Sequence, residues 1–269
     1  KESSDPPLHI PQKPEDYLPS IFIKEGKVLV IIRHVNYTFY HSEAKLFQHQ
    51  YGPLTYVHPE HDMHLRTTNY YCELNSELKI TKFHKVDFSK LDSPPIWEFR
   101  GLEDARVFRW EGKLYYCGVR RDTTTNGQGR MELCEIQVDD NGAREVSRFR
   151  IPCPGVGTDV HAGSYCEKNW MPIIDKPYHF VKWCNPVEIV KADPVTRTCS
   201  TKFMSSSAKL ASEQRGGSQL IPIEDGYLCI THEVIFYYGY RNENNKKDAT
   251  YRHRILKFNK DLEIVCCSD

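Results

Sequence analysis

The residues of this 269-residue chain with the clearest chemical potential surround Asp104. Asp104 stands between a second carboxylate, Glu103, and a nearby cation, Arg106. A carboxyl group in such a place acts as a general acid if desolvation raises its pKa, or as a structural ion-pair partner if Arg106 keeps it ionised. The sequence predicts a catalytic Asp104 and leaves its protonation state open.

Basic side chains from distant parts of the chain indicate what ligand such a carboxylate would serve. Arginine offers a phosphate a bidentate fork, and lysine offers it a compact point charge. A glycine pair at positions 216 and 217 would let backbone N–H groups approach an anion or a sugar hydroxyl. The sequence has no phosphate-binding loop and no dinucleotide fingerprint, so we predict no cofactor. The side chains predicted to bind the anion are Arg33, Arg106, Lys168 and His232.

The overall composition narrows the class of protein. Lys plus Arg number 36 and Asp plus Glu also number 36, so the chain lacks the basic field of a non-specific nucleic-acid-binding protein. No stretch is long and apolar enough to span a membrane. The ten cysteines include no Cys-x-x-Cys pair, and several lie in apolar strand-like runs. We therefore predict no metal site, no nucleic-acid partner, no membrane span, reduced thiols and a cytoplasmic location.

The sequence predicts that β-strands position the candidate site residues. Short apolar runs alternate with Gly, Asn and Asp turns, and no long window has helical periodicity. A hairpin-like pattern of two apolar runs around a polar turn recurs along the chain. Hairpins repeated with further strands between them are typical of β-propeller blades, and four or five blades fit the length. The repeats cover residues 19–35, 105–121, 171–184 and 219–233, with a weaker fifth at 252–266.

The domain organisation follows from the same pattern. Residues 1–14 are polar and Pro-rich, which predicts an N-terminal arm, and residues 15–269 form a single β-propeller domain. The sequence stops just after a strand-like run. We expect the last blade either to be truncated here or to be closed by a strand from the arm.

The hairpin geometry predicts where the polar residues meet. The start of the first strand of a hairpin and the end of its second strand lie at the same edge. In a propeller the inner strands all run in one direction about the axis, so these edges share one rim. Charged residues flank strands in many proteins, but four repeats agreeing on one edge favour a site. The predicted site residues are Arg33, Asn36, Tyr37, Glu103, Asp104, Arg106, Lys168, Asn169, Trp170, Gly217, Ser218, Gln219, His232 and Glu233.

Four short motifs, in this order along the chain, resemble glycoside hydrolase family 130, the five-bladed-propeller β-mannoside phosphorylases. Gly101-Leu-Glu-Asp-Ala-Arg106 is similar to the family's G-[IL]-E-D-x-R blade, and Lys168-Asn-Trp170 to its K-N-W segment. The opening Leu18-Pro-Ser-Ile21 hairpin and the segment at 217–232 resemble the other two. The resemblance implies a five-bladed β-propeller with a central active-site cavity, in which Asp104 is the general acid.

The same resemblance implies that Arg106, Lys168, Asn169 and His232 line the sugar and phosphate subsites. The chain departs from the family pattern at Leu18, Ala105 and Glu233, which leaves the nucleophile open: inorganic phosphate, water or a glycan hydroxyl. We predict transfer of a mannose-like glycosyl group by a single inverting displacement, using a glycosyl phosphate or nucleotide sugar. The alternatives are an inverting glycoside hydrolase and a non-catalytic glycan-binding propeller.

Overall fold

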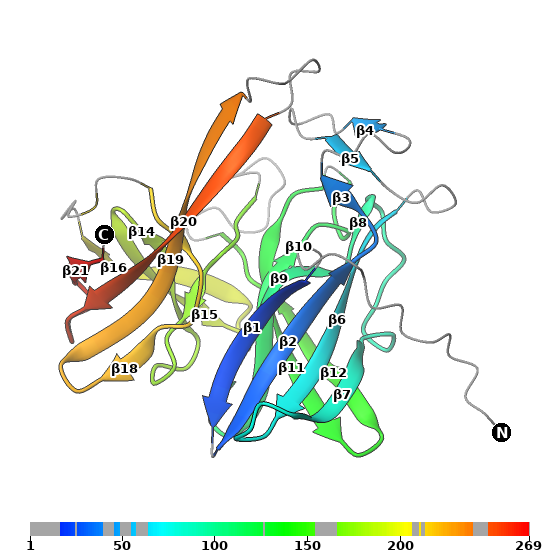
Figure 1. The fold of residues 1–269 in the computed structure, drawn as a ribbon, viewed down its shortest axis with the longest axis horizontal. Coiled ribbons are helices and arrows are strands. Elements are labelled where there is room, and N and C mark those ends of the chain that lie inside the picture. The colour runs from blue at the N-terminus through cyan, green and yellow to red at the C-terminus, as the bar shows by residue number, and fades with distance from the viewer. Residues whose placement is uncertain are drawn as a thin grey trace.

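The described part of the chain is built from β-strands alone (Figure 1). The computed structural model describes residues 17–24, 26–39, 46–48, 55–57, 64–125, 127–153, 166–205, 210, 213–238 and 247–268. The predicted arm at residues 1–14 lies outside these ranges. Most strands belong to four antiparallel units, which we call sheets. The nine-stranded sheet divides into two of them at a parallel contact between β7 and β12, and the four-stranded and five-stranded sheets are the other two.

The first two sheets lie side by side at the right of Figure 1. The outermost strands of the two sheets, β7 and β12, contact each other through two parallel residue pairs, Ala143 with Val86 and Arg144 with Asp87. We interpret each sheet as one blade. The first blade contains β1 (Tyr17–Lys24), β2 (Lys27–Val35), β6 (Leu65–Leu74) and β7 (Ile80–Asp87). The second contains β9 (Leu102–Trp110), β10 (Lys113–Arg120), β11 (Arg130–Asp139) and β12 (Gly142–Arg150).

The third and fourth blades occupy the left half of Figure 1. The third contains β13 (Met171–Pro172), β14 (His179–Cys184), β15 (Val187–Asp193) and β16 (Thr198–Ser205). In the fourth, β17 (Arg215–Gly216) and β18 (Ile221–Ile223) both pair with β19 (Gly226–Tyr238), followed by β20 (Lys247–Phe258) and β21 (Ile264–Cys267). The remaining strands are β3 (Thr38–Phe39), β4 (Leu46–Gln48), β5 (Thr55–Val57) and β8 (Phe99–Arg100).

The propeller prediction is confirmed, and the described residues supply four blades. The four strong hairpins of the sequence are the first strands of these four sheets, in order. The prediction of a fifth inner hairpin at 252–266 is wrong. Strand β20 pairs with β19 along its whole length, from Tyr227–Phe258 to Tyr238–Lys247, so β20 and β21 are the outer half of the fourth blade. The sequence pattern of a hairpin is the same whether its strands are the inner or the outer strands of a blade.

Apolar clusters between neighbouring blades hold the inner strands in place. Leu29 and Ile31 of the first blade pack with Val107 of the second. The second and third blades share a cluster of aromatic rings, in which the Trp110 indole also donates a hydrogen bond to the carbonyl of Ile173 at 2.9 Å. A third cluster joins the third and fourth blades. Because each blade is anchored on the next, strand edges far apart in sequence keep fixed relative positions.

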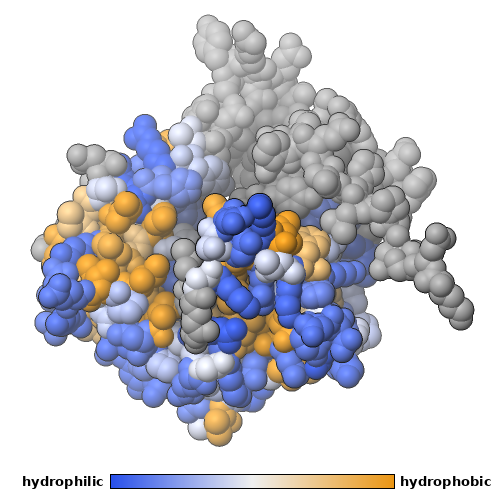
Figure 2. All heavy atoms as spheres, turned by 60° about the horizontal axis from the view of Figure 1, so that its bottom comes forward, coloured by the Kyte–Doolittle hydropathy of each residue, from blue (hydrophilic) through white to orange (hydrophobic). Residues whose placement is uncertain are grey.

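One face of the fourth blade carries exposed apolar side chains. Leu228 and Ile230 of β19 alternate with buried neighbours, and Ile255 of β20 lies directly opposite Ile230. Figure 2 shows apolar side chains gathered on the side where β18–β21 lie.

The cysteine side chains are all free thiols. None of the ten cysteines forms a disulfide, as predicted. Burial raises the pKa of most of them, for example to about 12 at Cys117 and Cys184, so these thiols are protonated at neutral pH. Within the described ranges, no helix has the length and apolar character needed to cross a bilayer.

Candidate active site

A β-bulge on the innermost strand of the second blade re-aims Asp104. Strand β10 pairs Cys117 with Arg106 but Val119 with Glu103, so two residues of β9 lie opposite Gly118 alone. Asp104 has a φ of 53°, in the left-handed region that residues other than glycine rarely adopt. A Cβ atom at Gly118 would stand 2.3 Å from the carbonyl oxygen of Glu103, so the bulge requires glycine there.

The Asp104 carboxylate is held between cations from two other blades. One oxygen, Oδ1, lies 2.5 Å from Nη1 of Arg33 on β2, and the other lies 3.8 Å from Nζ of Lys168, which precedes β13. Arg33 also donates from Nη2 to the Tyr37 hydroxyl at 2.7 Å. Four of the predicted site residues, which come from three separate regions of the sequence, therefore lie together: Arg33, Tyr37, Asp104 and Lys168. The hairpin geometry predicts this meeting of strand ends.

The charges around Asp104 decide its protonation state. Burial by itself raises the pKa of this carboxyl group, because desolvation penalises the charged form. The opposing charges of Arg33, Lys168, Arg106 and Arg121 outweigh burial and hold the pKa well below its usual range. Asp104 is thus a carboxylate in the ligand-free site. Its direct ion-pair partner is Arg33, not Arg106 as the sequence had suggested.

Arg106 is a buried cation that binds backbone carbonyls instead of a carboxylate. Its Nη2 donates to the carbonyl of Gly216 at 2.7 Å and to Oδ1 of Asn169 at 3.4 Å, and its Nε donates to the carbonyl of Gly217 at 3.3 Å. The side chain is only 6% exposed. Among the described residues no carboxylate lies within ion-pair distance, and Nη1 has no hydrogen-bond acceptor.

The glycine pair at 216 and 217 therefore serves the site differently from the prediction. Its carbonyls hold Arg106, whereas the N–H of Gly217 donates to the carbonyl of Ile230 at 3.0 Å. A Cβ atom at Gly216 would lie 2.0 Å from the carbonyl oxygen of Asn169, whose own φ is 64°. The glycine thus permits a close crossing that brings Asn169 beside Arg106.

Glu103 lies between two arginines. Its Oε2 is 3.6 Å from Nη2 of Arg33, and its Oε1 is 3.7 Å from Nε of Arg121. The carboxylate is buried. Glu103 therefore orients the two cations rather than offering a free acid to a substrate.

His232 lies on the same side of the molecule as Asp104 but is not a cation. Burial, with the nearby charges of Arg106, Arg215, His253 and Lys168, lowers the pKa of His232 to about 4. Arg106 and Lys168 also lower the pKa of Asp104, which places the two groups near one centre. Because the imidazole is neutral at pH 7, the predicted role of His232 as a phosphate-binding cation is corrected to that of a hydrogen-bonding group.

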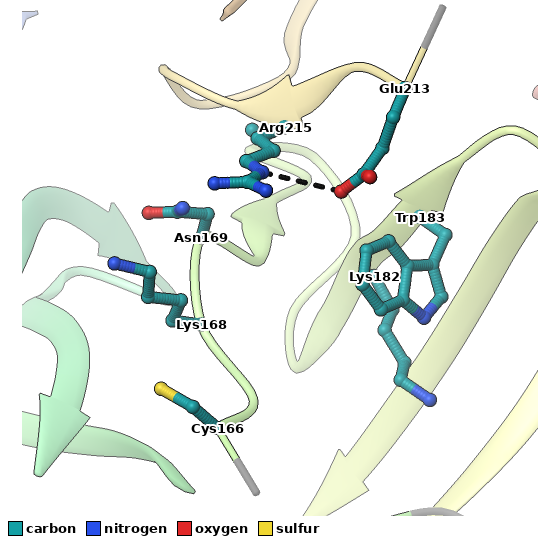
Figure 3. Close-up of a pocket in the computed structure, with 8 residues that line it drawn as sticks. Cys166, Lys168, Asn169, Lys182, Trp183, Glu213 and Arg215 are labelled. Carbon is teal, nitrogen blue, oxygen red and sulfur yellow. Dashed lines mark hydrogen bonds and ion pairs between the residues drawn. The ribbon is translucent and has the colours of Figure 1, made fainter. Parts of the chain in front are cut away.

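A cavity of about 200 Å³ lies beside this charged centre (Figure 3). Lys168 and Asn169 are among the predicted site residues. The edge argument from the sequence also brings Trp183, one residue before the end of β14, and Arg215, at the start of β17, to the same rim, although neither was selected as a site residue. The cavity is lined by Cys166, Lys168, Asn169, Lys182, Trp183, Glu213, Arg215 and Gly216.

The other predicted residues form bonds within the framework. The Asn36 amide binds the backbone of His64 and Arg66, and Gln219 donates to the carbonyl of Val107. Ser218 accepts from the N–H of Ile230. Trp170 donates from its buried indole to Glu167 at 3.1 Å, and Glu233 accepts from Arg254 at 3.3 Å. A direct role for these side chains in binding stays a prediction.

Comparison with known proteins supports the fold. No protein-family model and no curated protein matches this sequence. The structure is similar to a putative glycoside hydrolase from Bacteroides ovatus, with a TM-score of 0.54 and 12% identity over 94% of this chain and 72% of that chain. At this identity the similarity establishes the fold alone.

Two other solved structures align with lower scores. An α-L-arabinofuranosidase from Lactobacillus brevis has a TM-score of 0.44 and 11% identity over 91% of this chain and 74% of that chain. A family 117 glycoside hydrolase produced by the marine bacterium Zobellia galactanivorans has a TM-score of 0.39 and 12% identity over 91% of this chain and 63% of that chain.

Proposed function

We propose that this protein is a carbohydrate-active enzyme that transfers a glycosyl group between a phosphate-bearing sugar and an acceptor. The observation that carries the proposal is Arg106, a buried guanidinium with an unused donor and no carboxylate partner among the described residues. A buried charge without a counter-ion destabilises a protein by several kcal/mol. An anionic ligand would remove that cost and use the unused donor.

The charge of the centre supports an anionic ligand. Arg33, Arg106, Arg121 and Lys168 all act on the Asp104 carboxylate. Among the described residues, two carboxylates form ion pairs with these four cations, Asp104 itself and Glu103. A site for a neutral glycoside has no need of this excess of positive charge. A phosphate group matches it, because arginine binds phosphate through two parallel hydrogen bonds.

The ionised state of Asp104 favours the direction of transfer to an acceptor. As the acceptor hydroxyl attacks the anomeric carbon, its proton passes to Asp104 and a new carbon–oxygen bond forms. The bond from that carbon to the phosphate oxygen breaks, and phosphate leaves with the electron pair. Arg106 and Lys168 stabilise the departing charge. One displacement without a protein nucleophile inverts the anomeric configuration.

The general-acid role of the sequence prediction is the reverse of the same step. A protonated Asp104 would then donate its proton to the oxygen leaving the anomeric carbon, while phosphate attacks. Binding of a phosphate near Arg33 and Lys168 would offset their charges, and the pKa of Asp104 would rise towards neutral pH. The substrate thus brings the carboxyl group into the range where it can exchange a proton. The Bacteroides ovatus neighbour, named a glycoside hydrolase, is consistent with carbohydrate chemistry on this fold.

A thermal-shift screen tests the proposal with inorganic phosphate, glycosyl phosphates, nucleotide sugars and uncharged glycosides. A ligand at a hundred times its Kd stabilises the folded protein by about 2.7 kcal/mol. We expect phosphate-bearing compounds to raise the Tm of the wild type but not of Arg106→Met. Arg109→Met is the matched control, because Arg109 lies on the same strand and donates to the carbonyl of Gly112 at a hairpin turn.

Two results would contradict the proposal. One is an equal phosphate-induced shift in Arg106→Met and wild type, which would place the anion elsewhere. The other is stabilisation by uncharged glycosides alone, with release of free sugar in the absence of an acceptor, which would identify a glycoside hydrolase, and an inverting one if the released sugar has the opposite anomeric configuration.

A further inference from the structure

Trp183 is a wide aromatic side chain left partly exposed in the wall of the cavity. It is 38% exposed, whereas Trp170 of the preceding segment is 1% exposed. Single exposed apolar residues are common and by themselves indicate nothing. What distinguishes Trp183 is that polar groups surround it and that the backbone changes register there: β14 pairs Val181 with Ile189 but Trp183 with Glu188. The irregularity places successive side chains, Lys182 and Trp183, along the same cavity.

Charged side chains of the cavity lining on both sides of Trp183 are neutralised in pairs. Nε of Arg215 lies 3.2 Å from Oε1 of Glu213 (Figure 3). Nζ of Lys182 lies 3.2 Å from Oε2 of Glu188. The Glu213 carboxylate at the cavity wall opposes a phosphate there but accepts hydrogen bonds from hydroxyl groups. An aromatic plane facing paired donors and acceptors matches a neutral sugar ring, which has an apolar face and a polar edge.

The cavity adjoins the reacting carboxylate. Lys168 lines it and also lies 3.8 Å from Asp104. Asn169 lines it and accepts from Arg106. In Figure 3 the side chains of Lys168, Asn169 and Arg215 extend to one side of the cavity, and Trp183 lies across from them. A sugar in the cavity would therefore have a hydroxyl group within reach of the charged centre.

The cavity is large enough for a sugar ring. Its volume of about 200 Å³ is more than ten times the roughly 10–15 Å³ that a single water molecule needs. The excess positive charge lies at Arg33 and Arg106, outside the cavity lining, so the phosphate group belongs there.

We propose that this cavity is the acceptor subsite, in which Trp183 stacks on the apolar face of a neutral sugar ring and the Arg215–Glu213 pair binds its hydroxyl groups. The assignment of the sugar as the acceptor rests on the proposed glycosyl transfer. Binding of a neutral sugar at Trp183 does not depend on it.

The test measures binding of neutral mono- and disaccharides by thermal shift and saturation-transfer NMR to wild type, Trp183→Ala and Trp183→Phe. Loss of the aromatic contact should weaken sugar binding about tenfold in Trp183→Ala. Trp183→Phe, which keeps an aromatic plane, should retain most of the affinity. Met204→Ala is the control, because Met204 is an exposed apolar residue of the same blade outside the cavity lining. Inorganic phosphate should stabilise all four proteins equally.

The outcomes separate this inference from the proposed function. Wild-type sugar affinity in Trp183→Ala, or no sugar binding by the wild type, overturns the subsite while leaving phosphate binding intact. Loss of the phosphate response in the wild type overturns the proposed function, and the sugar result then still decides the subsite. In the transfer reaction, Trp183→Ala should raise KM for the acceptor about tenfold and leave KM for the glycosyl phosphate within about twofold.

Discussion

Replacing Asp104 with asparagine separates the catalytic and structural roles of this carboxylate. Asparagine keeps the size of the side chain and removes the charge that faces Arg33 at 2.5 Å and Lys168 at 3.8 Å. Breaking a buried ion pair costs about 3–5 kcal/mol. Here Glu103, 3.6 Å from Arg33, still offsets part of the orphaned charge, so we expect a smaller loss of stability, about 2–3 kcal/mol. For a protein of this size that lowers Tm by roughly 5–10 °C.

The activity should fall much further than the stability. Removing a proton-transfer group slows turnover by about a hundred- to ten-thousand-fold. Transfer should therefore be measured well below the Tm of the variant, where it is fully folded. Phosphate binding should be tighter in Asp104→Asn than in the wild type, because a negative charge next to the anion has been removed. A structural residue would show the loss of stability without the loss of turnover.

The pH dependence gives an independent check of the Asp104 ion pairs. The folded pKa of Asp104 lies below its unfolded value of about 3.9, so its contribution to stability is present above that pH and is lost as the pH falls further. The difference in unfolding free energy between wild type and Asp104→Asn should thus be constant at neutral pH and shrink below about pH 4. The control is Asp139→Asn, which removes a half-exposed pair with Arg144, less buried than the Asp104 pairs, and should change Tm and turnover little.

Three results would refute this reasoning. Retention of more than about a tenth of the wild-type turnover would exclude Asp104 as the proton-transfer group. An unchanged Tm would mean that Arg33 does not depend on Asp104 for its charge compensation. Weaker phosphate binding in the variant would mean that the anion contacts Asp104 itself, as a protonated donor.

Two further substitutions test the geometry and the charge of the site. Gly118→Ala should abolish most transfer activity and lower stability by about 1–3 kcal/mol, because its Cβ would meet the Glu103 carbonyl at 2.3 Å and disturb the bulge that aims Asp104. Gly112→Ala, in a hairpin turn with φ of 78° and open space around it, should cost stability but spare activity per folded molecule. In the wild type, the unfolding free energy should fall as the pH drops from about 6.5 to 4, because His232 is protonated in the unfolded chain but not in the folded one. His232→Gln should remove this part of the pH dependence. An equally steep dependence in that variant, measured by denaturant unfolding, would contradict a neutral buried His232.

Local features of the sequence were sufficient for the blades and for the centre of the site. The hairpins come from turn residues flanked by apolar runs, and both are visible within about fifteen residues, as at Glu111-Gly112 between β9 and β10. Once hairpins are recognised, the antiparallel geometry dictates which ends meet. That rule was enough to bring Arg33, Asp104 and Lys168 together.

Tertiary structure alone decided which partners these groups have and what charge they carry. The hairpin at 252–266 belongs to the fourth blade because β20 pairs with β19. Which strand β20 pairs with is a long-range property that the local sequence pattern does not encode. Asp104 is ionised because charges from several blades surround it, and Coulomb interactions depend on distance in space, not on separation in sequence. Arg106 bound the carbonyls at 216 and 217 instead of its neighbour Asp104 for a similar reason: a bulge turned the two side chains of one strand towards different blades.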